Sequence, residues 1–206
     1  MKLLFVHGWG FDRHFWEPVC ALLPNHEHLF EDRGYFGNPL QPHIDGPFLA
    51  VTHSLGAMRV LSEALPGLTG IMAINGFDRF SARSGREGVA LRVIDRMLRR
   101  FNQDPAAVLS EFRTRCGCEA EFGPLDLAPL HEDLLRLRDG EAPTPHVPVT
   151  VLQGSQDPLM PHGMRESVFP HGPVRRIGHG GGHLLPLQDP AFCADAIRHM
   201  AESLPA

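Results

Sequence analysis

The sequence predicts an α/β fold, built from a mostly parallel sheet with helices on both faces and a helical insertion between two of the strands. Short apolar runs alternate with stretches whose apolar residues recur at helical spacing, which is the pattern of a parallel sheet. One central segment shows helical spacing only. The chain has 206 residues, 43% of them hydrophobic, so we expect a single domain covering residues 1–206.

The expected strands are short apolar runs that end in polar or glycine-containing turns. They cover residues 2–6, 28–30, 48–51, 70–74, 149–152 and 173–177. Helical spacing between and after these runs predicts helices at residues 13–23, 55–65 and 190–204. Consecutive strands joined through helices pair in parallel within one sheet.

Residues 77–145 are expected to form a helical lid inserted between two strands. Apolar residues recur there with a helical period at Ala90, Ile94, Met97 and Phe101, at Val108 and Phe112, and at Leu127, Leu130 and Leu134. The proline-containing run EAPTP at 141–145 marks the exit from this insertion.

The apolar run at residues 3–6 is shorter than the roughly 7 to 15 apolar residues of a signal peptide. No run approaches the roughly 18 apolar residues of a membrane span. We therefore expect a cytoplasmic protein that does not associate with a membrane.

The four cysteines are Cys20, Cys116, Cys118 and Cys193, and their scatter along the chain favours reduced thiols over a disulfide framework. Cys116 and Cys118 are accompanied by no second pair and no suitably spaced histidine. We therefore expect neither a metal nor an organic cofactor.

The formal net charge of -5 argues against a nucleic-acid partner, because nucleic-acid-binding proteins usually carry a basic surface. The charge is unevenly distributed. Residues 78–118 contain nine arginines and five acidic residues, so this segment carries +4 and the rest of the chain -9.

Ser54 is the candidate nucleophile. The motif THSLG at 52–56 lies between an expected strand and an expected helix, which is the context of a nucleophile elbow. Such a turn exposes the serine hydroxyl and directs the next backbone N–H toward the reacting carbonyl oxygen. Thr52 departs from the motif, because a β-branched residue stands where glycine is usual.

An acid and a base follow in the chain order serine, aspartate, histidine that accompanies this elbow. Asp157 follows the strand at 149–152 and is expected to orient the base, although an Asp-Pro turn at the surface is an alternative. The loop after residues 173–177 offers His179 and His183. We favour His183, which directly precedes the apolar start of the last helix. His179 begins an HGGG run, but the oxyanion motif of that composition belongs before the nucleophile.

The oxyanion site is expected at HGWG, residues 7–10, between the first strand and the first helix. A tetrahedral intermediate needs two fixed N–H donors, and we assign them to Trp9 and Leu55. His7 and His53 are expected to be structural.

In the expected mechanism, His183 takes the proton from Ser54 as the serine attacks an acyl carbon. Asp157 holds the imidazole tautomer, and water later releases the acyl group.

These motifs, with GSQDP at 154–158 and GHLLP at 182–186, resemble those of the α/β-hydrolase superfamily over most of the chain. A narrower resemblance is to the pimeloyl-[acyl-carrier protein] methyl ester carboxylesterases of biotin synthesis. It rests on HGWG at 7–10, SLG at 54–56, AING at 73–76 and FSAR at 80–83.

The resemblance implies which residues contact the substrate and the partner. Trp9 would bind substrate. So would the segment that corresponds to the part of that family's lid that lines the acyl channel, which consists of Phe112, Arg113, Thr114, Arg115 and Cys116. The partner would be an acyl-carrier protein, which is strongly acidic. The basic face of the lid would dock it through Arg79, Arg83, Arg92, Arg96 and Arg99. A solvated helix face rich in arginine is the alternative.

We therefore expect a serine carboxylesterase that hydrolyses the methyl ester of pimeloyl-carrier protein. A general short-chain esterase or an acyl thioesterase is the alternative among enzymes, because the same triad cleaves both kinds of bond. A non-catalytic binding protein of this fold is the alternative of another class, favoured by Thr52.

Overall fold

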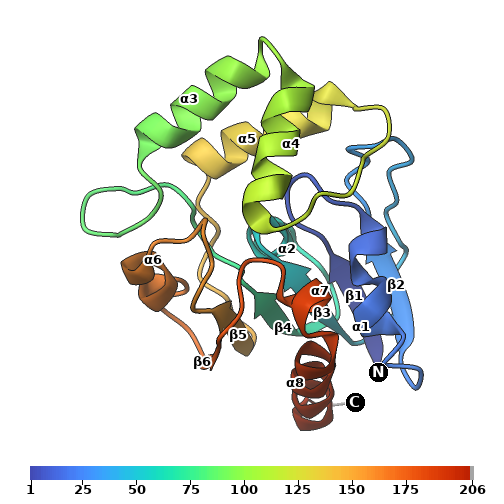
Figure 1. Ribbon diagram of the computed structural model, residues 1–206. Helices are drawn as coiled ribbons and strands as arrows, with labels where there is room; N and C mark the ends of the chain where they lie inside the picture. Colours follow the sequence, from blue (N-terminus) through green and yellow to red (C-terminus); the bar gives the residue numbers. More distant parts are fainter. Residues whose placement is uncertain (205–206) are drawn as a thin grey trace.

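A computed structural model of the protein describes residues 1–204 and contains a six-stranded sheet in which all neighbouring strands are parallel. The strand order is β2-β1-β3-β4-β5-β6 (Figure 1). The strands are β1 (Lys2–Val6), β2 (Glu27–Glu31), β3 (Phe48–His53), β4 (Leu68–Ile74), β5 (Val149–Gly154) and β6 (Val174–His179). All six expected strands are therefore confirmed, most of them extended by one or two residues.

The central strands are apolar on both sides, because helices cover both faces of the sheet. Leu3 and Phe5 of β1 join one core cluster, whereas Leu4 and Val6 join the other. This alternation follows from the two-residue period of a strand. The α/β architecture predicted from the sequence is thus confirmed.

Helices near the chain ends cover one face. They are the 3-10 helix η1 (Arg13–Trp16), α1 (Glu17–Cys20), α7 (Leu185–Gln188) and α8 (Pro190–Ser203). Trp16, Val19 and Ile197 pack there against the strand residues Phe5 and Leu49. Helix α2 (Leu55–Ser62) covers the other face, and α6 (His162–Ser167) lies between β5 and β6 in sequence.

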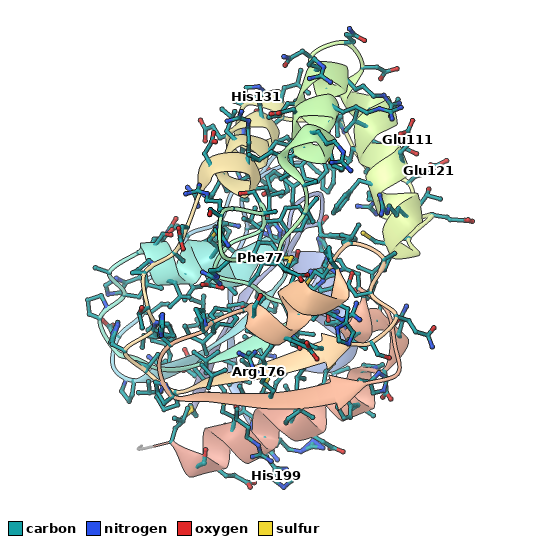
Figure 2. All side chains as sticks on the ribbon, turned by 90° about the vertical axis from the view of Figure 1, so that its left-hand side faces the viewer. Phe77, Glu111, Glu121, His131, Arg176 and His199 are labelled. Atoms are coloured by element: carbon teal, nitrogen blue, oxygen red, sulfur yellow. The ribbon has the colours of Figure 1, made fainter. Side chains whose placement is uncertain are left out.

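Three helices lie between β4 and β5 in sequence: α3 (Leu91–Phe101), α4 (Pro105–Cys116) and α5 (Leu127–Asp139). They gather at one end of the molecule, far from α8 (Figure 1). Figure 2 shows Glu111 and His131 at that end, with Arg176 and His199 at the other. The side chains of Asp104 and Asp126 cap the N-termini of α4 and α5.

Helix α5 is tied to the loops after β1 and β2. Trp9 Nε1 donates to the carbonyl of Leu130 at 2.8 Å, and the hydroxyl of Tyr35 donates to Asp133 at 2.6 Å. Arg33 Nε also donates to Asp133, at 3.0 Å. These bonds fix the insertion over the sheet edge where the candidate residues lie.

The first helix differs from the expected span of residues 13–23. It is split into η1 and α1, which ends at Cys20. Pro18 has no N–H and cannot continue a helix that begins at Arg13, so α1 restarts with proline in its first turn. The short helices α6 and α7 were not predicted, since four to six residues show no helical period.

Across the described residues, no helix combines the length and the apolar character that crossing a membrane requires.

Candidate active site

Ser54 occupies a strained turn between β3 and α2. Its backbone has φ 53° and ψ -122°, a conformation that non-glycine residues rarely adopt. The turn is held by the N–H of Ser54, which donates to the carbonyl of Ile74 at 3.0 Å. This is the geometry of a nucleophile elbow.

Two glycines allow the elbow to pack closely. A Cβ on Gly8 would lie 2.9 Å from the Cβ of Ser54, so the loop after β1 runs directly beside the serine. A Cβ on Gly56 would lie 2.6 Å from the carbonyl oxygen of Val6, so α2 touches the end of β1. Any larger residue at either position would push the loop or the helix away from Ser54.

Thr52, which departs from the elbow motif, is fully buried in β3. Its hydroxyl donates to the carbonyl of Met72 at 3.1 Å. The β-branched side chain is therefore accommodated without an unpaired polar atom.

Asp157 and His183 form a buried pair at the ends of β5 and β6. His183 Nδ1 lies 2.7 Å from Asp157 Oδ2, and the two residues are 1% and 6% exposed. Because a carboxylate only accepts, Nδ1 is the donor in this pair, and Nε2 is the ring nitrogen that remains available to act as a base. Within the described residues, His183 Nε2 is buried without a hydrogen-bond partner, as a base awaiting a proton would be.

The charge of Asp157 is stabilised locally. Burial alone would raise the pKa of Asp157, but the nearby His183 and the hydrogen bonds from His183, Leu159 and Met160 outweigh it and lower the pKa. The carboxyl group is therefore ionised at neutral pH and able to hold the imidazole.

The backbone of His183 is held by two side chains. His53 Nε2 donates to the carbonyl of His183 at 3.0 Å, and Asn75 Nδ2 donates to the same oxygen at 2.8 Å. The His53 ring lies 4.8 Å from the His183 ring, centroid to centroid. Burial holds the pKa of His53 well below its ordinary value, so His53 stays neutral and serves as a donor.

Asn75 links the loop of the acid to the loop of the base. Its Oδ1 accepts from the N–H of Gly154, three residues before Asp157, and its Nδ2 also donates to Gly182. Asn75 is fully buried and has φ 47°, a conformation that asparagine tolerates better than most residues. Sequence reasoning did not select Asn75 as a site residue. Its signals were a polar side chain at the end of a buried strand and its place in the AING motif at 73–76.

The expected oxyanion donors flank Ser54. Leu55 is the first residue of α2, where backbone N–H groups have no partner within the helix. Trp9 follows Gly8, which touches the serine. Among residues 1–204, neither of these two N–H groups donates to a backbone carbonyl. His7 is buried, with Nδ1 2.9 Å from the carbonyl of Gly8, and so orders this loop.

His179, the alternative base, lies apart from Asp157. Its Nε2 is 3.3 Å from Asp189, and its Nδ1 accepts from the N–H of Gly181 at 3.0 Å. These contacts order the loop before α8, and it is His183 that the structure pairs with Asp157.

A pocket of about 770 Å³ lies between the insertion and the loop that follows Asp157. Asp157 and residues 158–161 line one wall, and residues of α3, α4 and α5 line the other. Ser54 is 6% exposed and does not line this pocket. The pocket therefore reaches the candidate site from its aspartate side.

The expected substrate residues divide into two groups. Phe112 and Arg115 line the pocket, whereas Arg113, Thr114 and Cys116 do not. Arg113 is buried and donates to the carbonyl of Gly10 at 2.8 Å, which makes it a brace for the loop after β1. The side chain of Trp9 packs edge-on against Phe112, with ring centroids 4.9 Å apart. Trp9 itself does not line the pocket.

The expected docking arginines also divide. The expectation that Arg79 lies on the docking surface is corrected, because its side chain is buried and only 4% exposed. Arg83 is bound to Glu141 and to the carbonyl of Asp139. Arg92, Arg96 and Arg99 are exposed on α3, and Arg96 also lines the pocket.

Within the described residues, no three histidine, cysteine, aspartate or glutamate side chains are placed to hold a metal ion.

Comparison with known proteins identifies the fold. No protein-family model and no curated protein matches the sequence. Among solved structures, an esterase from Exiguobacterium antarcticum superposes with a TM-score of 0.83 at 14% identity, over 98% of this chain and 92% of that one. A hydrolase from Oleispira antarctica superposes with a TM-score of 0.78 at 10% identity, over 98% of this chain and 90% of that one. An enol-lactonase from Burkholderia xenovorans superposes with a TM-score of 0.64 at 16% identity, over 98% of this chain and 91% of that one. The chain has the α/β-hydrolase fold.

Proposed function

We propose that the protein is a serine hydrolase that cleaves carboxylic esters, with Ser54 as nucleophile, His183 as base and Asp157 as the residue that orients the base. The buried His183–Asp157 pair, 2.7 Å apart, carries the proposal, since it leaves His183 Nε2 without a partner among residues 1–204. The strained elbow at Ser54 supports it, because such strain persists where function requires it.

The proposed reaction follows from these roles. Ser54 Oγ attacks the ester carbonyl and His183 Nε2 takes its proton, while Asp157 stabilises the imidazolium that forms. The N–H groups of Trp9 and Leu55 stabilise the oxyanion. His183 then gives the proton to the leaving alcohol, and water attacks the acyl-enzyme by the same route in reverse.

The structurally similar proteins support ester chemistry, since they include an esterase and an enol-lactonase. Both are at most 16% identical to this chain in sequence, so their activities cannot be transferred to it directly. The proposal therefore depends chiefly on the arrangement of this chain's own side chains.

The proposed substrate is the methyl ester of pimeloyl-carrier protein. Two features support it: the resemblance to the methyl esterases of biotin synthesis, and the exposed arginines Arg92, Arg96 and Arg99 on α3. An acidic carrier protein is a suitable partner for such a helix, because complementary charges steer and orient encounters.

A fluorophosphonate probe tests the nucleophile. We expect it to label the wild-type protein and Ser110→Ala, a control at an exposed serine of α4, but not Ser54→Ala. Labelling of Ser54→Ala at the wild-type rate would mean that Ser54 is not the nucleophile. Absence of labelling in the wild type would favour a non-catalytic protein.

Incubation with methyl pimeloyl-carrier protein, followed by mass spectrometry of the carrier, tests the substrate. We expect loss of the methyl group while the thioester to the carrier stays intact. Release of the whole acyl chain without demethylation would identify a thioesterase instead.

A further inference from the structure

The pocket beside Asp157 has an apolar floor. Ile94 and Met97 of α3, Val108 of α4 and Leu134 of α5 contribute to it, together with Phe112. A volume of about 770 Å³ is in the range of small-molecule sites. The floor can therefore bury an alkyl or aromatic group of substantial length.

The acidic side chains that line this pocket are already paired. Glu111 is bound by Arg100, and Asp157 by His183 together with the N–H groups of Leu159 and Met160. Neither carboxylate forms a salt bridge with a further arginine of the lining.

Three arginines of the lining form no salt bridge among the described residues, although Arg96 is one of the charges that lower the pKa of Glu111. Arg115 donates to the carbonyl of Pro158 at 2.9 Å, and Arg165 donates to the carbonyl of Met160 at 2.8 Å. Both bonds have neutral acceptors and fix the guanidinium groups on the loop after Asp157. Arg96 reaches the pocket from α3 and is exposed.

We propose that this pocket binds an acyl group that carries an anion at its far end, with the chain on the apolar floor and the anion between Arg96, Arg115 and Arg165. This inference rests on the proposed function, because it identifies the acyl substituent of the same ester. An arginine fork fixed in place binds a carboxylate or a phosphate well, since little conformational entropy is lost on binding. The anion is either a carboxylate of the substrate itself or the phosphate of a carrier protein's prosthetic arm.

Binding to Ser54→Ala tests this without hydrolysis. Monomethyl suberate and methyl octanoate have acyl chains of equal length and differ in the distal carboxylate. Titration calorimetry should show the charged ester binding about fivefold more tightly, as expected for a partly exposed ion pair. S-octanoyl-4′-phosphopantetheine serves as the phosphate probe. Tighter binding than monomethyl suberate identifies the prosthetic arm as the source of the anion, and weaker binding identifies the substrate carboxylate.

Variants locate the anion. In the Ser54→Ala background, Arg115→Gln and Arg165→Gln should each remove most of the preference for the charged ester. Arg99→Gln is the matched control, since Arg99 is exposed on α3 and does not line the pocket. Equal binding of the two methyl esters, or the same loss in Arg99→Gln, overturns the proposal. Thermal melting curves confirm that each variant is folded.

The outcome for the pocket is separable from that for the enzyme. A charge preference in Ser54→Ala, with no ester hydrolysis by the wild type, supports the pocket and contradicts the proposed function. Suppose instead that the wild type hydrolyses both esters at equal kcat/KM and that the arginine variants have no effect. This result supports the proposed function and contradicts the anion-binding pocket.

Discussion

Asn75 joins the two loops that carry Asp157 and His183. Its side chain accepts from Gly154 and donates to the carbonyls of Gly182 and His183. The acid and the base come from different loops, and their 2.7 Å contact requires those loops to keep a fixed separation. Asn75 is therefore a positioning residue of the proposed site.

We expect Asn75→Gly to lower kcat for p-nitrophenyl acetate by at least about tenfold and to leave KM within about twofold, because alignment affects the chemical step. Glycine avoids any penalty at the positive φ of Asn75. Asn38→Gly is the control, since Asn38 has φ 56° and is exposed. A rise in KM with unchanged kcat would argue against alignment.

Asp32 stabilises the loops at the ends of β1 and β2. Burial alone would raise the pKa of Asp32, but its contact with His7 and the N–H groups of Gly34 and Arg13 lower it to about 2. A pKa lowered by folding contributes stability above the pKa of the unfolded chain, near 3.8, and that contribution disappears as the pH falls through about 2.

We therefore expect Asp32→Asn to lower the urea midpoint at pH 6, and the difference from wild type to shrink as the pH approaches 2. Urea unfolding at a series of pH values measures it. Asp45→Asn, at an exposed aspartate, should leave the midpoint unchanged. A difference between Asp32→Asn and wild type that is constant with pH would contradict this assignment.

Helix α3 has two faces with different tasks. Ile94, Leu98 and Phe101 are buried against the other helices of the insertion. Arg92 and Arg99 are exposed and do not line the pocket, so they are the residues with which to test carrier docking separately from substrate binding.

We expect Arg92→Glu with Arg99→Glu to lower kcat/KM for the carrier-bound ester several-fold and to spare p-nitrophenyl acetate, because reversed charges repel an acidic partner. Steady-state kinetics with both substrates measures this. Arg175→Glu, at an exposed residue of β6, is the control for net charge. Equal losses on both substrates would remove the docking proposal.

Helix α5 is anchored through a buried carboxylate. Asp133 is fully buried and accepts from Tyr35 and Arg33. Its removal leaves the Tyr35 hydroxyl without an acceptor inside the protein.

We expect Asp133→Ala to cost about 2–4 kcal/mol in the free energy of unfolding, measured by urea titration. Glu132→Ala is the matched control, since Glu132 also binds Arg33 but is exposed. It should cost less than about 1 kcal/mol. If both variants lost the same free energy of unfolding, the burial of Asp133 would not be the reason for its stabilising effect.

At the scale of the molecule, positive charge is concentrated in the first part of the insertion. Residues 78–118 carry +4 and the remainder carries -9. Such a field acts over about 10 Å at 0.1 M salt and is screened at higher concentrations.

We expect kcat/KM for carrier-bound ester to fall several-fold as NaCl rises from about 0.05 M to about 0.5 M, because screening weakens the encounter. The rate with p-nitrophenyl acetate, a neutral substrate, should change little over the same range. A salt effect of the same size on both substrates would point to the chemical step instead of docking.

The sequence by itself determined the strands, the parallel α/β architecture and the elbow at Ser54, because hydrophobic period and turn chemistry are local properties of the chain. It also narrowed the acid and the base to Asp157 and two histidines, because both follow buried strands. Their catalytic roles stay predictions.

Only the tertiary structure decided which residues meet. The partners of Asn75 lie 79 and 108 positions away, and Arg113 binds Gly10 across 103 positions. The burial of Arg79 and the charged pocket beside Asp157 likewise depend on how the insertion packs over the sheet. No local pattern encodes such contacts, since they exist only when segments distant in sequence are brought together by packing.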